Sequence, residues 1–161
     1  MNALIQRILA TRPCNWSPAP LRLAAGLVFI GHGSQKLFGW FGGPGLKATA
    51  QFFSNTLHLS PGVFWAGLAG CGEFFGGLGL LFGLATRFFG LVNAVTMVVA
   101  ILTAHISKGF FAQGGGFEYP LTLLLVMLSL MVSGGGACSI DALLAGKSCR
   151  SGNTPLVPAA N

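Results

Sequence analysis

The sequence has few charged residues and very few acidic ones. Asp, Glu, Lys and Arg together make up 7% of its 161 residues, whereas a soluble domain contains about 25%. Hydrophobic residues make up 53%, and the mean hydropathy is +0.73. A surface this poor in charge argues against an ordinary soluble globular protein and indicates an integral membrane protein.

The three acidic residues, Glu73, Glu118 and Asp141, are outnumbered by nine Lys and Arg, which gives a net charge of +6. A nucleic-acid-binding protein would gather its basic residues into a patch or stripe. Here they stand singly at the ends of apolar runs, as expected of topology signals that contact anionic lipid. We therefore expect the lipid bilayer, and no nucleic acid, as the partner of this surface.

Motifs for metal binding and catalysis are also missing. None of the four cysteines belongs to a C-x-x-C pair, so we expect reduced thiols and no metal site. No Walker loop or nucleophile elbow occurs, so we name no catalytic residue and expect no covalent cofactor. The cysteines are Cys14, Cys71, Cys138 and Cys149.

Four apolar runs are present, over residues 21–41, 63–85, 88–106 and 117–133. A membrane-spanning helix needs about 20 mostly apolar residues, and the fourth run is the shortest. None of the runs has a polar face, so a soluble bundle would leave them uncovered. We predict an all-α integral membrane protein with a four-transmembrane-helix bundle. The bundle domain covers residues 19–145, after an interfacial amphipathic helix in residues 1–18 and before a flexible cytoplasmic tail, 146–161.

Basic residues predict which side of the membrane each end faces. Six Lys and Arg lie on the side of the two termini and at most three on the other side. Because cytoplasmic loops are enriched in Lys and Arg, both termini are predicted to be cytoplasmic. The six are Arg7, Arg12, Arg22, Arg87, Lys147 and Arg150; the three are Lys36, Lys47 and Lys108.

The connections between the runs contain signals for short helices and caps. Residues 47–57 carry two Phe among polar residues, which predicts a short interfacial helix. Thr86 is expected to cap the third long helix at its N-terminus. Ser139 is expected to do the same for a last short helix that contains Asp141.

Three ionisable residues, His32, Lys36 and Glu73, lie inside the first two runs. His32 and Lys36 are four residues apart and so share a helix face. At 1.5 Å per residue, His32 lies about 14 Å and Glu73 about 15 Å from the same outer surface. Antiparallel helices would therefore bring them together near the middle of the bilayer. Because a cationic partner lets a carboxylate stay ionised there, we expect Glu73 to pair with His32, Lys36 or both.

Charged groups inside a membrane are costly, which makes this cluster a candidate ligand or proton site. A quinone is one ligand that suits it, because a quinone needs an apolar slot with one or two hydrogen-bonding groups. The rival interpretation is a buried polar clamp that sets the register of the two helices.

Glycines recur in the second run at intervals of three or four residues, the pattern of small-xxx-small helix packing. We expect the glycines of this run to bring Glu73 close to the first helix. The glycine stripe also leaves room for self-association of the chain through the second span. Its residues are Gly72, Gly76, Gly79 and Gly83, and the adjacent stripe of small residues around Glu73 is Ala66, Gly70 and Gly77.

A second polar group, formed by His105, Lys108 and Glu118, lies between the third and fourth runs. These residues are expected either to cap helix ends, with Glu118 at the start of the fourth helix, or to form the outer rim of a cavity. That cavity would lead down to Lys36 and Glu73. The aromatic residues predicted for the outer membrane interface are Trp40, Trp65 and Tyr119.

Two spaced motifs resemble those of the DoxX family, and the end of the sequence is similar to that family as well. The resemblance covers roughly residues 19–145. His32, Lys36 and Glu73 match the polar positions of the motifs. The motifs are HGSQKLFG at 32–39 with FGGPG at 41–45, GEFFGG at 72–77 with GLATR at 83–87, and GGG at 134–136 with SID at 139–141.

The resemblance implies a four-helix, multi-pass protein of the bacterial inner (plasma) membrane. Some relatives are named as small subunits of a quinol oxidase or of a thiosulfate:quinone oxidoreductase. The first hypothesis is therefore a redox-associated accessory subunit that binds a quinone at the cluster of ionisable residues, with a redox enzyme subunit as partner. The alternatives are a membrane scaffold or assembly partner without a ligand, and a small-solute transporter.

Overall fold

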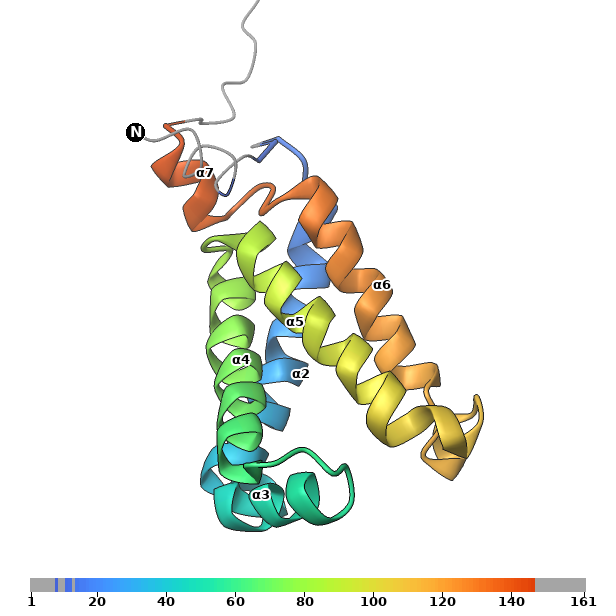
Figure 1. Ribbon diagram of the computed structural model, residues 1–161. Helices are drawn as coiled ribbons and strands as arrows, with labels where there is room; N and C mark the ends of the chain where they lie inside the picture. Colours follow the sequence, from blue (N-terminus) through green and yellow to red (C-terminus); the bar gives the residue numbers. More distant parts are fainter. Residues whose placement is uncertain (1–7, 9–10, 13, 147–161) are drawn as a thin grey trace, which may run out of the picture.

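Four long helices make up most of the computed structural model, which describes residues 8, 11, 12 and 14–146 (Figure 1). The described part contains no strand, so the predicted all-α class is confirmed for it. Of the interfacial helix predicted within residues 1–18, residues 1–7, 9, 10 and 13 lie outside the described residues, as does all of the predicted tail 146–161 except residue 146. The long helices are α2 (Pro18–Phe38), α4 (Gly62–Phe82), α5 (Thr86–Ala100) and α6 (Glu118–Ser133).

Several short elements connect the long helices. A short helix is present near residues 47–57, as predicted, and forms α3 (Gly45–Asn55). α5 continues through a π-helical turn, η2 (Ile101–His105), into a 3-10 turn, η3 (Ile106–Lys108). The remaining elements are η1 (Trp40–Gly42), η4 (Ala112–Gly114) and α7 (Ile140–Leu144).

The four long helices match the four predicted runs but are not equally suited to a bilayer. Gly62–Phe82 and the continuous helix Thr86–Lys108 are long and apolar enough to cross a membrane. α6 is apolar but has 16 residues. α2 has 21 residues and is less apolar, because it carries Arg22 and Lys36. It ends at Phe38, before the predicted limit, because the next residue is a glycine with a left-handed φ of 74°.

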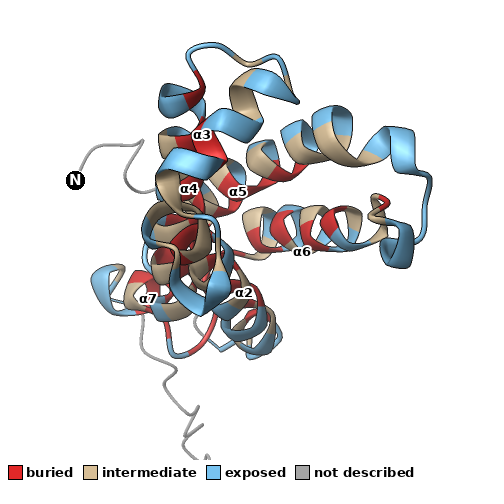
Figure 2. Cartoon of the chain, turned by 90° about the horizontal axis from the view of Figure 1, so that it is seen from below, coloured by how far each residue is buried: buried red, intermediate tan, exposed pale blue. Residues whose placement is uncertain are grey.

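The helices pack as two pairs, α2 with α4 and α5 with α6. The pairs diverge toward the end where α3 lies, and α7 lies at the opposite end (Figure 1). Buried residues lie on the sides of the helices that face one another, whereas outward sides are exposed (Figure 2). The core where the pairs meet includes Phe29, Leu80, Met127 and Leu130.

Glycines set the distance between α2 and α4. A Cβ atom added at Gly33 would lie 2.5 Å from the backbone nitrogen of Phe74. One added at Gly77 would lie 2.7 Å from the backbone nitrogen of Ile30. Larger residues at these positions would push the helices apart, so α2 and α4 touch through their backbones.

The glycines of α4 face two different helices. Gly70 and Gly77, of the adjacent stripe that contains Glu73, lie against α2, as expected of glycines that bring Glu73 close to the first helix. Gly72, Gly76 and Gly79 of the other stripe face α5, which covers them within the chain. Cβ atoms added at Gly72, Gly76 and Gly79 would meet Val92, Asn93 and Phe89, respectively, and one added at Gly83 would meet Arg22.

A buried carboxylate holds the end of the molecule at α7. Asp141 accepts hydrogen bonds from the backbone N–H groups of Ala85 (2.7 Å) and Thr86 (3.0 Å), where α5 begins. The prediction that Thr86 caps this helix is wrong, because the Thr86 hydroxyl has no hydrogen-bond partner among the described residues. Ser139 caps α7 as predicted, accepting a hydrogen bond from the N–H of Ala142 (3.1 Å).

The cysteines depart in part from the prediction of reduced thiols. Cys71 and Cys138 are free, but Cys14 is disulfide-bonded, so the prediction is wrong for Cys14. Sequence spacing alone carries no information about which cysteines meet in space. Within the described part of the chain, no group of three or more His, Cys, Asp or Glu side chains is placed to hold a metal ion.

Substituting Gly33 with alanine tests the backbone contact, and Gly31 offers a matched control in the same helix. A Cβ added at Gly31 meets no atom within 4 Å. We expect Gly33→Ala to destabilise the protein by about 1–3 kcal/mol through overpacking. Gly31→Ala should stabilise it by up to about 1 kcal/mol through helix propensity. Thermal unfolding midpoints in one mild detergent measure both, and equal midpoints would contradict the contact.

Candidate functional site

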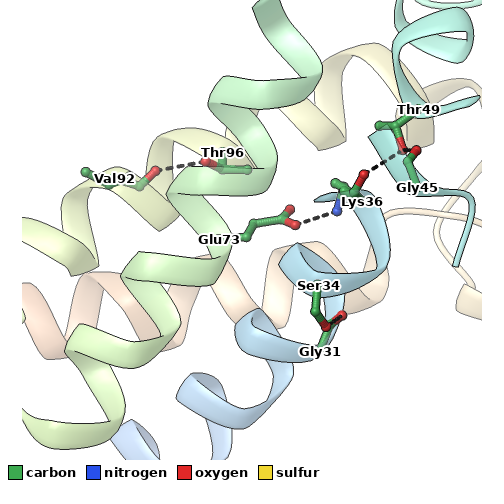
Figure 3. A network of polar contacts seen from close by, with 8 residues as sticks. All are labelled: Gly31, Ser34, Lys36, Gly45, Thr49, Glu73, Val92 and Thr96. Carbon is green, nitrogen blue, oxygen red and sulfur yellow. Dashed lines mark hydrogen bonds and ion pairs between the residues drawn. The ribbon is translucent and has the colours of Figure 1, made fainter. Parts of the chain in front are cut away.

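Glu73 and Lys36 form an ion pair across the contact between α4 and α2. Lys36 Nζ lies 2.5 Å from Glu73 Oε2 (Figure 3). The Glu73 side chain is 5% exposed and the Lys36 side chain 25% exposed. The close backbone approach at Gly33 brings the lysine within reach of the carboxylate.

The backbone carbonyl of Lys36, in the last turn of α2, faces α3. Thr49 Oγ1 donates a hydrogen bond of 2.7 Å to the carbonyl of Gly45 and lies 3.5 Å from the carbonyl oxygen of Lys36 (Figure 3). Thr49 is 5% exposed. α3 therefore packs against the end of α2 that carries the ion pair.

His32 shares the Lys36 face of α2 but forms no hydrogen bond to Glu73 in the described structure. Its ring lies beside Tyr119, in the first turn of α6, with ring centroids 6.3 Å apart. No hydrogen bond joins the His32 ring or the Tyr119 hydroxyl to another described residue. Both polar groups are therefore available to a ligand.

One cavity of about 1000 Å³ lies between the two helix pairs and is lined by His32, Lys36, Glu73 and Tyr119. Its size is at the upper end of the roughly 300–1,000 Å³ found for small-molecule sites. The rest of the lining is mainly aliphatic and aromatic. It includes Phe29 of α2, Phe52 of α3, Trp65 and Leu68 of α4, Val95 of α5 and Leu123 of α6.

Two threonine hydroxyls in the lining are already engaged by their own helix. Thr96 donates to the carbonyl of Val92 (3.0 Å) and Thr103 to that of Val99 (2.7 Å). Such bonds satisfy the hydroxyl proton locally. The polar groups that a ligand would meet are therefore concentrated at His32, Tyr119 and the ion pair.

The three residues predicted for the outer rim separate in the structure. His105 lines the cavity, and its Nδ1 lies 2.7 Å from the carbonyl oxygen of Gly115. Glu118 lies outside the lining and accepts a hydrogen bond of 2.9 Å from the N–H of Ala112, at the start of η4. Lys108 is also outside the lining. His105 therefore lies in the cavity wall, whereas Glu118 lies at the start of α6, outside the lining.

Tyr119 was predicted for the membrane interface, and its place beside His32 was missed. A tyrosine at the start of an apolar run has the same sequence pattern in either role. The π-helical turn η2 was missed as well, although π-turns are frequent at functional sites. It includes His105 and so helps to place this side chain at the cavity. No spacing in the sequence marks such a turn.

A double-mutant cycle tests the coupling of the ion pair. Lys36→Met leaves the nearly buried Glu73 without its cation, and we expect a loss of about 3 kcal/mol in the free energy of unfolding. Glu73→Leu should cost less, because the partly exposed lysine can turn toward water. The double variant should return to within about 1 kcal/mol of wild type. Thermal unfolding in detergent measures all four proteins, and additive losses would show that the pair is not coupled.

The DoxX sequence profile matches residues 17–106, a range that contains both motifs of α2 and α4. The Bacillus subtilis (strain 168) protein named "Putative oxidoreductase CatD" is 31% identical over 121 residues, which cover 75% of this chain and 81% of that protein. Two uncharacterised Haemophilus influenzae proteins are 33% identical over 104 residues (60% of this chain, 78% of that protein) and 32% identical over 65 residues (40% and 43%). No solved structure matches the chain. Because the profile covers more than half of the sequence, the chain belongs to the DoxX family.

Proposed function

We propose that the protein is a membrane-embedded, redox-associated accessory subunit that binds a quinone in the cavity between its helix pairs. The observation that carries this proposal is a large apolar cavity whose polar groups gather at His32, Tyr119 and the Lys36–Glu73 ion pair. A quinone ring is flat and apolar, and its two carbonyl oxygens accept hydrogen bonds. Imidazole, phenol and ammonium groups all donate them.

The ion pair supplies the proposed site with both a hydrogen-bond donor, Lys36, and a hydrogen-bond acceptor, Glu73. Lys36 donates hydrogen bonds to an oxidised ring, and the Glu73 carboxylate accepts them from a reduced one. Both lie in a low-dielectric setting, where such bonds are electrostatically stronger than in water. The name of the Bacillus relative, "Putative oxidoreductase CatD", is in keeping with redox association.

The proposed setting is the bacterial inner membrane, spanned by all four long helices with both termini in the cytoplasm. Two of these helices are apolar and long enough to cross, and the start of α2 lies at the same end of the molecule as α7. The excess of Lys and Arg toward the termini supports the cytoplasmic side for that end. The proposed partner is a redox enzyme subunit. Self-association would use faces other than the glycine stripe of α4, since α5 covers it.

Quinone content of the purified protein tests the proposal. The full chain is purified in a mild detergent from quinone-containing membranes, and extracted quinone is measured per mole of protein by chromatography. Wild type should retain quinone, and Glu73→Gln should retain roughly tenfold less, because one charge-assisted hydrogen bond contributes about 1.5–3 kcal/mol. Glu118→Gln is the matched control, since it makes the same chemical change outside the cavity and should retain the wild-type amount.

A thermal unfolding midpoint for each variant separates loss of ligand from loss of fold. If Glu73→Gln does not fold, His32→Ala takes its place, because the His32 ring makes no hydrogen bond on which the described structure depends. Quinone absent from wild type, or unchanged in both folded variants, would overturn the proposal. A ligand-free protein in which Glu73→Gln only lowers the midpoint would favour the scaffold interpretation.

A further inference from the structure

The wall of the cavity between α4 and α5 is also part of the outer surface of the molecule. Leu68 of α4 is 55% exposed, and Leu91 and Val95 of α5 are 47% and 55% exposed, although all three line the cavity. α5 leans away from α4 toward the end where α3 lies (Figure 1). The cavity is therefore open sideways along α4 and α5, on a face that would meet lipid in a membrane.

The charge of the lining restricts which head group can bind. Lys36 and Glu73 are the cavity's fully charged side chains, and they neutralise each other at 2.5 Å. A phosphate group would require a cation that is not already paired, typically an arginine or a lysine. The lining offers neutral hydrogen-bonding groups on His32 and Tyr119 instead. An uncharged polar head complements such a lining better than an anionic one.

We propose that the ligand is an uncharged amphiphile with a long apolar tail that leaves the cavity sideways between Leu68 and Val95. Its polar ring would lie beside His32, Tyr119 and the ion pair. The inference rests on the proposed quinone site and narrows it to quinones that carry a long tail.

The tail adds little affinity of its own, because lipid is as apolar as the groove it would occupy. The opening matters sterically: a tailed ligand needs an exit for its chain, and the ring alone does not. Narrowing the opening should therefore exclude tailed quinones selectively. This selectivity distinguishes a lateral exit from a closed pocket that takes only the ring.

The test compares a decyl-tailed benzoquinone with the same ring lacking the tail, in detergent-solubilised full-length protein. Trp65 lines the cavity, so its fluorescence in a Trp16→Phe/Trp40→Phe background reports binding as saturable quenching. The opening is narrowed by Leu68→Phe/Val95→Phe. Leu125→Phe is the matched control, because Leu125 is 58% exposed on α6 and does not line the cavity.

We expect the narrowed variant to bind the tailed quinone at least about tenfold more weakly than wild type, because a steric misfit in an apolar site costs about that much affinity. The tail-less ring should bind the variant and wild type with equal affinity. Leu125→Phe should bind both like wild type. Equal weakening of both ligands, or of neither, would overturn the lateral exit although quinone still binds to wild type. Displacement of the bound ring by an anionic phospholipid would overturn the uncharged class. Absence of saturable quenching by either quinone in wild type would instead count against the proposed function itself.

Discussion

Where Gly33 of α2 meets Phe74 of α4, the two helices approach until their backbones touch, and Glu73 is buried beside this contact. Desolvating a carboxylate costs several kcal/mol, which its attraction to a cation offsets only when the geometry is close. Lys36 supplies that geometry because the glycines remove the side chains that would otherwise separate the helices. The packing and the electrostatics therefore depend on each other, and either alone would be unfavourable.

The second helix pair gives this ion pair its surroundings. α5 packs on α6 and touches α4 through the glycine stripe, but both helices diverge from α2 and α4 toward α3. The divergence leaves a cavity lined mainly by apolar side chains, with the ion pair in its wall. At the other end, Asp141 ties α7 to the start of α5 and closes the bundle. A bundle closed at one end and spread at the other has room for a ligand without losing its core.

The sequence predicted most of the helices and the pairing of Glu73 with Lys36, because both follow from local patterns. Apolar runs, the serine cap at Ser139 and the four-residue spacing of His32 and Lys36 depend only on neighbours along the chain. What the sequence missed depended on which elements meet in space: α5 covers Gly72, Gly76 and Gly79, Asp141 replaces Thr86 as the cap, and Tyr119 lies beside His32. In each case a helix presents several faces with similar composition, and the sequence does not say which neighbour each face meets. The cavity arises from the angle between helix pairs, which no local pattern encodes.

Infrared spectroscopy of Glu73 tests the central claim most directly. The chain has two glutamates, Glu73 and Glu118, so carbon-13 labelling of glutamate in the Glu118→Gln background reports on Glu73 alone. The account predicts the stretching bands of an ionised carboxylate in the membrane-reconstituted protein, perturbed when a tailed quinone is added. It also predicts that Lys36→Met replaces these bands with that of a protonated carboxylic acid. A protonated Glu73 with Lys36 intact, or a carboxylate indifferent to both Lys36→Met and quinone, would contradict the account.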